Sequence, residues 1–130
     1  MDKPILTGSA DAAFRGDATK YNPEEFLLMA LSSCHMLWYL HLCANAGVVV
    51  TAYSDNATAI MDINDDGSGK FSSATLHPKI IIDDESYMET AYGLHKDANR
   101  YCFIANSCNL TINHKTEIFI KGKPWKKLLK

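Results

Sequence analysis

The longest stretch without charged side chains lies between residues 26 and 44. Helix-start signals precede it, because Asn22 is a good N-cap residue, Pro23 suits the first helical position, and two glutamates follow where the helix dipole favours negative charge. Gly47 then marks a C-terminal stop. The pattern predicts one long helix between Asn22 and Gly47. Since its apolar residues fall on every face, we expect this helix to be buried on all sides.

The rest of the chain alternates like sheet, with one further helix. Residues 48–63 and 71–83 have a β-rich character, and the turn residues 64–69 between them predict a hairpin. Residues 84–101 have helical spacing, and residues 109–121 predict a last strand. The second helix places these apolar residues on one face: Tyr87, Ala91, Leu94 and Ala98. We expect residues 1–20 to be extended or looped, and the basic tail 121–130 to be a solvated end.

The order of helix, hairpin, helix and strand predicts an α+β fold, in which a long central helix packs against an antiparallel sheet. At 130 residues the chain is long enough for a single domain, residues 1–130, and too short for two. Three strands and one short helix are too little to cover a helix that is apolar all round. Either residues upstream of Met1 or a second copy of the chain must supply the missing cover, and the second alternative predicts a homodimer.

The composition of the chain argues against two kinds of partner, a membrane and a nucleic acid. The 26–44 stretch is long enough to be considered as a membrane span, but Ser32, Ser33, His35 and His41 lie within it and no second span exists, so we expect no membrane insertion. The net charge of -2 and the pI of 6.2 give no electrostatic case for nucleic acid. Without a signal-peptide pattern at its start, the chain is expected to be cytoplasmic and its four cysteines to be thiols.

Cys34 lies in the third turn of the predicted helix. A cysteine surrounded by apolar residues is most often an inert core residue, and the helix dipole fades beyond the first turn. A reactive Cys34 would need a cation delivered from elsewhere. The residues alone favour a structural role and leave a chemical one open.

A longer sequence pattern around Cys34 favours a chemical role for this cysteine over a structural one. The run Asn22-Pro23-Glu24-Glu25-Phe26, followed ten residues after Glu24 by Ser33-Cys34-His35, resembles the signature of the OsmC/Ohr family of thiol-dependent peroxidases. A second cysteine near the end of a later helix is matched by Cys102 within the segment 101–107, and the segment 13–17 resembles the approach to the motif in one branch of the family. The similarity extends over nearly the whole chain.

The resemblance implies an OsmC-like fold, an intertwined homodimer with long central helices between sheets, and active sites at the subunit interface. It implies that Cys34 is the peroxidatic thiol, which attacks an organic hydroperoxide and becomes a sulfenic acid. Cys102 would be the resolving thiol that condenses with it to a disulfide, and an external dithiol would reduce that disulfide. Hydrogen peroxide is a further possible substrate, and no cofactor is required.

The resemblance also implies a glutamate and an arginine beside the reactive thiol. Ten helical residues separate Glu24 from Cys34, about 15 Å of rise and some 80° of rotation, so we expect the partner helix of the dimer to deliver Glu24. The chain has only two arginines. Arg15 precedes the motif and is the expected activator of Cys34, with Arg100 as the second choice. Family chains usually carry an N-terminal hairpin before this point, and the sequence leaves open whether the native chain extends before Met1.

The other candidates carry weaker chemistry. Cys43 faces away from Cys34 and is expected in the core, and His35 is expected to be a satisfied core histidine. Cys108 could compete with Cys102 as the resolving thiol, but we expect a buried cysteine at a strand start. His41 shares the face of Cys34 but is roughly 10 Å along the axis, too far for a base. No Cys or His spacing indicates a metal site. The alternative function is a non-catalytic OsmC-like dimer that binds a small apolar ligand between subunits.

Overall fold

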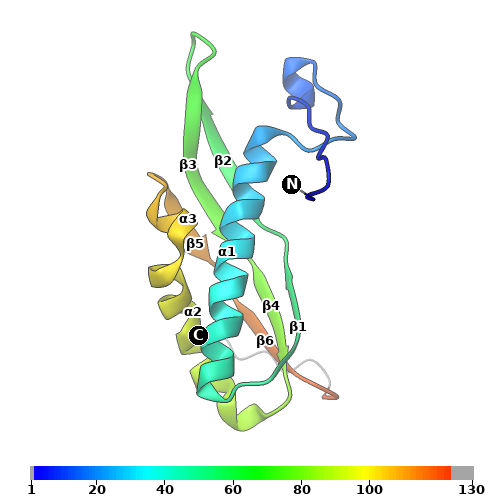
Figure 1. The fold of residues 1–130 in the computed structure, drawn as a ribbon. Helices are drawn as coiled ribbons and strands as arrows, with labels where there is room; N and C mark the ends of the chain where they lie inside the picture. Colours follow the sequence, from blue (N-terminus) through cyan, green and yellow to red (C-terminus); the bar gives the residue numbers. More distant parts are fainter. Residues whose placement is uncertain (1, 124–130) are drawn as a thin grey trace.

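A computed structural model describes residues 2–123 of the chain, so the expected packing of the tail residues 124–130 lies outside the described part (Figure 1). The helices are α1 (Pro23–Ala46), α2 (Met88–Tyr101) and α3 (Phe103–Asn106), with 3-10 turns η1 (Ala12–Phe14) and η2 (Glu85–Tyr87). The strands are β1 (Val50–Asp55), β2 (Thr58–Ile63), β3 (Gly69–Leu76), β4 (Pro78–Ile82), β5 (Thr111–His114) and β6 (Glu117–Ile120). The α+β prediction is confirmed.

Helix α1 begins and ends where its sequence signals predict. The Glu25 backbone N–H donates to Asn22 Oδ1 (2.8 Å), and the Asn22 backbone N–H donates to Glu25 Oε1 (3.0 Å), which completes a capping box. Gly47 ends the helix with a φ of 81°, in the left-handed region that favours glycine. The helix therefore has fixed ends and crosses the molecule in front of both sheets (Figure 1).

The expectation that α1 is buried on all sides is wrong for a single chain. Its buried residues recur every four positions, at Leu31, His35, Tyr39 and Cys43, and form one stripe. The opposite face is open to solvent, and the side chain of Leu37 is 63% exposed. Helix α1 is long and apolar enough to span a membrane, but the core helices of soluble proteins often meet the same criterion. In this structure 22% of its most apolar 18-residue window is buried.

The three long strands of the sequence prediction are six shorter ones. Each of the three breaks near the same level, at residues 56–57, 77 and 115–116, so the molecule has two three-stranded sheets, β1-β4-β6 and β2-β3-β5. Asp55 lies at the first break. Its carboxylate accepts hydrogen bonds from Ser32 Oγ of α1 (2.6 Å) and from the His77 backbone N–H (2.7 Å). Asp55 therefore connects the first strand break both to α1 and to the break at residue 77.

The strands pair in both directions. The predicted hairpin is confirmed, because β2 pairs with β3 and β1 with β4 in the antiparallel sense. The last strand differs from the prediction, since β5 pairs with β3 and β6 with β4 in the parallel sense. Parallel pairing needs a crossover connection, which α2 and α3 provide between β4 and β5.

The interior has two hydrophobic cores of unequal size. The larger lies between α1, α2 and the sheet β1-β4-β6, and its buried residues are Tyr39, Cys43, Val48, Ile80, Ile82, Met88, Ala91, Ala98, Ile118 and Ile120. The smaller lies between α1 and the sheet β2-β3-β5, and its buried residues are Leu31, Ala74 and Leu76. On α1 the stretch 32–37 separates the residues of the two cores.

Tyr39 anchors α1 in the larger core. Its side chain is fully buried, and its hydroxyl donates a 2.8 Å hydrogen bond to the Ala91 carbonyl of α2. Tyr39→Phe should cost about 1 kcal/mol of unfolding free energy for the lost hydrogen bond, whereas Tyr39→Ala should cost about 4 kcal/mol for the ring. Urea unfolding of both variants measures the two costs. Equal costs would contradict the larger role assigned to ring packing.

Candidate functional site

The structure brings Cys34 and Cys102 together. Cys34 lies in α1 and is half-buried, and Cys102 lies at the junction of α2 and α3 with its side chain 1% exposed. The two thiols are within hydrogen-bonding contact of each other, and both are free rather than joined in a disulfide. Two thiols that are 68 residues apart in the sequence are therefore neighbours in the folded chain, and Cys34 lies in a helix with capped ends.

The local structure around Cys102 explains its position. Its extended backbone (φ -65°, ψ 111°) ends α2 and starts α3, where its Sγ accepts a 3.4 Å hydrogen bond from the Ala105 N–H. Burial first and the pairing with Cys34 second raise the pKa of the Cys102 thiol to about 11, although hydrogen bonds from the Ala105 and Ile104 N–H groups act in the opposite direction. Cys102 is accordingly a protonated thiol at neutral pH.

Aromatic side chains border the two thiols. Trp38, one helical turn after Cys34, stacks on Tyr101 with ring centroids 5.0 Å apart and meets Phe103 edge-on at 5.8 Å. We call Trp38, Tyr101 and Phe103 the aromatic shelf. Phe103 is 70% exposed, so the shelf is open to solvent. The sequence analysis did not single out these aromatic residues, although the position of Tyr101 and Phe103 on either side of Cys102 was a usable signal.

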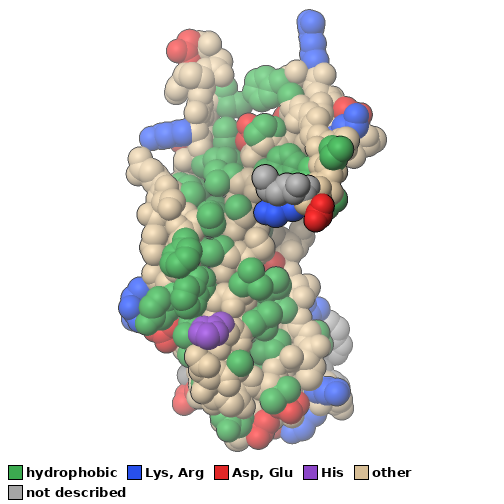
Figure 2. Space-filling view, viewed as in Figure 1, with side chains coloured by type: hydrophobic (Ala, Val, Ile, Leu, Met, Phe, Trp, Pro, Cys, Tyr) green, Lys and Arg blue, Asp and Glu red, His purple; other side chains and the backbone are tan. Residues whose placement is uncertain are grey.

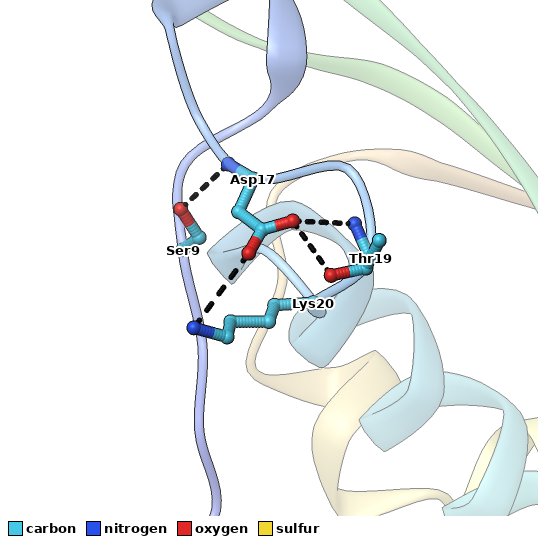
Figure 3. A network of polar contacts seen from close by, with 4 residues as sticks. All are labelled: Ser9, Asp17, Thr19 and Lys20. Carbon is cyan, nitrogen blue, oxygen red and sulfur yellow. Dashed lines mark hydrogen bonds and ion pairs between the residues drawn. The ribbon is translucent and has the colours of Figure 1, made fainter.

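Arg15 stands apart from the thiols in this single chain. It is exposed, follows η1 with a φ of 64°, and makes no side-chain hydrogen bond or ion pair within residues 2–123. Its segment lies beyond the N-terminal end of α1 (Figure 1). Asp17 fixes the base of that segment: its carboxylate accepts from the Thr19 N–H and hydroxyl and pairs with Lys20, and its own N–H donates to Ser9 Oγ (Figure 3).

Glu24 also lies away from Cys34 of its own chain. It is on the first turn of α1, half-buried, and lines a cavity of about 340 Å³ under the N-terminal segment. Among the described residues its carboxylate has no hydrogen-bond or ion-pair partner. The second arginine, Arg100, places its guanidinium 4.3 Å from the ring centroid of Tyr101, at the surface end of the aromatic shelf. The structure therefore groups Cys34 with Cys102 but neither with Arg15 nor with Glu24.

Two buried histidines and a half-buried one form a cluster that begins at the residue after Cys34. His35 Nε2 is 3.0 Å from His95 Nδ1, and the ring of His114 packs 4.6 Å from that of His35. Burial lowers the pKa of His35 to about 4, helped by repulsion from His114, and lowers the pKa of His95 to about 2. His35 is a core residue as predicted, but its Nδ1 has no partner within the described residues, so it is only half satisfied.

The remaining candidate residues lie in the core or on the surface and do not join the thiol pair. Cys43 is 1% exposed in the larger core, as predicted, and burial raises its pKa. Cys108 is half-buried, packed beside the smaller core, rather than fully buried. His41 is exposed and lies 3.3 Å from Asn45. Within residues 2–123 no three His, Cys, Asp or Glu side chains are grouped so that they could hold a metal ion.

A groove of about 770 Å³ runs along another face of α1. Its wall on the helix includes Phe26, Met29 and Met36, and the strand break at residues 53–57 forms the other side. Hydrophobic side chains gather along α1 on the face that Figure 2 shows. Neither Cys34 nor Cys102 lines the groove, so this apolar surface is separate from the thiol pair.

Comparison with known proteins identifies a family and several similar structures. A family model described as OsmC-like protein matches residues 16–117. An OsmC-like protein of unknown function from Vibrio cholerae has a solved structure with 33% identity and a TM-score of 0.69, over 80% of this chain and 68% of that one. No curated protein matches the chain.

Two more distant structures share the fold. An organic hydroperoxide resistance protein from Vibrio cholerae, with captopril bound in one active site, is 23% identical with a TM-score of 0.62, over 98% of this chain and 82% of its own. The organic hydroperoxide resistance protein OhrB of Bacillus subtilis is 19% identical with a TM-score of 0.60, over 84% of this chain and 76% of its own. At these identities the likeness concerns the fold.

Proposed function

The chain belongs to the OsmC-like family, and on that premise we propose that it is a thiol-dependent peroxidase that reduces organic hydroperoxides. The contact between the thiols of Cys34 and Cys102 is the observation that carries the proposal. A peroxide-reacting cysteine needs a second thiol close enough to capture its sulfenic acid before further oxidation. The described chain provides that thiol in direct contact.

The roles of the two cysteines follow from their surroundings. The thiolate is the nucleophile in peroxide reduction, and the raised pKa of Cys102 keeps its sulfur protonated and unreactive. Cys34 is also the more accessible of the pair. Cys34 is therefore the proposed peroxidatic residue and Cys102 the proposed resolving residue.

The proposed cycle has three steps. The Cys34 thiolate attacks the terminal oxygen of the hydroperoxide, the O–O bond breaks, and the departing alkoxide takes a proton to become an alcohol. Cys102 then attacks the sulfur of the Cys34 sulfenic acid, which forms the disulfide and releases water. An external dithiol finally reduces the disulfide and is itself oxidised to a cyclic disulfide. A reducing compartment such as the cytoplasm suits this last step.

Activation of Cys34 requires a cation that one chain does not bring to it. We propose that the protein is a homodimer and that the partner subunit supplies this cation as a guanidinium held by a carboxylate. Arg15 and Glu24 are the proposed residues, and both side chains are without ionic partners in the described chain. The exposed apolar face of α1 supports the dimer, because a solvent-exposed Leu37 beside other apolar residues is typical of a surface that is covered in an assembly.

Treatment of the reduced protein with one equivalent of an organic hydroperoxide tests the proposal. We expect a disulfide between Cys34 and Cys102, identified by mass spectrometry as a link between tryptic peptides 21–70 and 101–115, with fragment spectra that exclude Cys43 and Cys108. In Cys102→Ser the sulfenic acid should persist on Cys34 and react with dimedone. Unmodified cysteines after peroxide would contradict the peroxidase and favour the alternative dimer, with an apolar ligand in the groove along α1.

A further inference from the structure

The contact between the two thiols depends on where the short segment around Cys102 is held. Cys102 joins α2 to α3, and α3 has only four residues. A helix of about one turn has little stability of its own, so its position is set by its contacts with the rest of the chain. The contacts that hold the junction of α2 and α3 on α1 therefore also keep Cys102 near Cys34.

Aromatic rings on both sides of Cys102 hold the junction on α1. Tyr101 stacks on Trp38 with ring centroids 5.0 Å apart, and Phe103 meets the same indole edge-on at 5.8 Å. Contacts between aromatic rings stabilise a pair beyond the burial of its surface. The residues immediately before and after the proposed resolving cysteine are thus bound to one side chain of α1.

Trp38 is well placed to pass this restraint to Cys34. It follows Cys34 by four residues, about 6 Å of rise and about 40° of rotation, so the two side chains leave the same face of α1 one turn apart. The next residue, Tyr39, is fully buried and fixes this turn in the larger core. The aromatic shelf therefore ties the backbone around Cys102 to the turn of α1 that follows Cys34.

The other contacts of the junction are weaker anchors. Ile104 and Ala105 of α3 pack beside the smaller core. Asn106 Nδ2 donates a 3.0 Å hydrogen bond to the Arg100 carbonyl, but this bond lies within the junction and does not reach α1. A segment with little buried apolar surface opens at a low free energy, so the shelf supplies a large part of what keeps Cys102 in place.

We propose that Trp38, Tyr101 and Phe103 are positioning residues for the capture of the Cys34 sulfenic acid; this inference rests on the proposed function. In the capture step the Cys102 sulfur bonds to the Cys34 sulfur, the S–O bond breaks, and the hydroxyl group leaves with the Cys102 proton as water. These ring contacts lie within one chain, so they restrain Cys102 whether or not a partner subunit covers the exposed rings.

The restraint matters because a second reaction competes for the same sulfenic acid. Another molecule of hydroperoxide can transfer an oxygen atom to the Cys34 sulfur and leave as an alcohol, which turns the sulfenic acid into a sulfinic acid. Capture by a thiol that is held in place is effectively a unimolecular reaction and outruns this bimolecular one. The shelf thus protects Cys34 from irreversible oxidation.

A competition between Cys102 and dimedone for the sulfenic acid measures the restraint. Reduced protein receives one equivalent of an organic hydroperoxide in a fixed excess of dimedone. Mass spectrometry then compares the disulfide-linked peptides 21–70 and 101–115 with peptide 21–70 that carries dimedone on Cys34. This ratio is independent of how fast the peroxide reacts. We expect it to fall about tenfold in Trp38→Ala and about threefold in Phe103→Ala, which loses one of the two ring contacts.

Three controls separate positioning from a general loss of structure. Trp38→Phe keeps a ring at this position and should retain the ratio within about twofold. Ile60→Ala removes an apolar side chain of β2 that is 62% exposed, similar to Phe103 at 70%, and should leave the ratio unchanged. In a Cys102→Ser background, dimedone should label Cys34 at the same rate with and without Phe103→Ala; any difference is divided out of the ratio.

The outcomes distinguish this inference from the proposed function. If the wild-type protein forms no disulfide with peroxide, the proposed function itself fails. If the disulfide forms and Phe103→Ala leaves the ratio unchanged, only the inference is overturned, and this surface variant decides even where Trp38→Ala does not fold. A ratio in Trp38→Phe as low as in Trp38→Ala, or an equal fall in Ile60→Ala, overturns it as well. Excess hydroperoxide gives a second readout, because Phe103→Ala should accumulate sulfinic acid on Cys34 before the wild-type protein does.

Discussion

Cys34→Ser should abolish the thiol-dependent consumption of an organic hydroperoxide, with a loss of at least about 10³-fold in kcat/KM. A serine hydroxyl is not ionised at neutral pH and cannot replace the thiolate as the attacking group. The substitution exchanges sulfur for oxygen at a half-buried position, so the fold should remain intact. Cumene hydroperoxide consumption with dithiothreitol as reductant measures the effect.

The matched control is the same substitution at another half-buried cysteine. Cys108→Ser should retain wild-type activity, because Cys108 packs beside the smaller core and has no part in the proposed cycle. Circular dichroism and gel filtration show whether both variants keep the wild-type fold and assembly. Peroxide consumption by a folded Cys34→Ser at the wild-type rate would refute the proposed chemistry.

The second large effect is a loss of stability in acid. Between about pH 7.5 and pH 5 the free energy of unfolding should fall by about 4 kcal/mol, because the buried His35 and His95 must be neutral in the folded protein. Their pKa values, about 4 for His35 and about 2 for His95, are lowered by burial first and by neighbouring imidazoles second. Asp55 acts in the opposite direction on His114, although burial still lowers that pKa.

The sign follows from the proton counts. An unfolded histidine has a pKa of about 6.5, so below that pH the unfolded chain binds protons that the folded chain refuses. Stability is therefore complete above pH 6.5 and is lost as the pH falls toward the folded pKa. At pH 5 each of the two histidines contributes a loss of about 2 kcal/mol. This is a large part of the roughly 5–15 kcal/mol that stabilises an ordinary domain.

Urea titrations at several pH values measure this loss. His95→Phe should keep the stacking on Tyr39, whose ring centroid lies 3.8 Å away, and should reduce the slope of stability against pH by about half. The exposed His41 is the control position, and His41→Gln should leave the slope unchanged. A flat stability profile in the wild-type protein, or an unchanged slope in His95→Phe, would contradict the assignment.

Local signals predicted the elements well. The cap at Asn22, the glycine at 47 and the turn at 64–69 each specify a backbone conformation over a few residues, and the structure has all three features. The strand breaks at residues 56–57, 77 and 115–116 were not predictable in this way. They depend on contacts between distant segments, such as the bond from Ser32 to Asp55, and no local pattern reports these. The parallel pairing of the last strand has the same cause, because it follows from the crossover.

The site was predicted in part. The resemblance to a family singled out Cys34 and Cys102, and the structure places the two thiols in contact. Spacing along a helix predicts that Glu24 does not reach Cys34 of its own chain, and Glu24 lies on the first turn of α1. The histidine cluster was not foreseen as a group, because His35, His95 and His114 come from α1, α2 and β5 and meet only in the folded chain. Their sequence neighbours gave no sign of it.

The two unequal cores have a consequence for motion. A region with little buried apolar surface unfolds locally at a lower free energy than a region with more. We therefore expect the part of the molecule around Leu31, Ala74 and Leu76 to unfold locally before the larger core does. Cys34 lies on α1 between Leu31 and Tyr39, at the seam where the loosely held half joins the firmly held one. The proposed peroxidatic residue therefore lies at the boundary between a part of the chain that opens at a lower free energy and one that opens at a higher free energy.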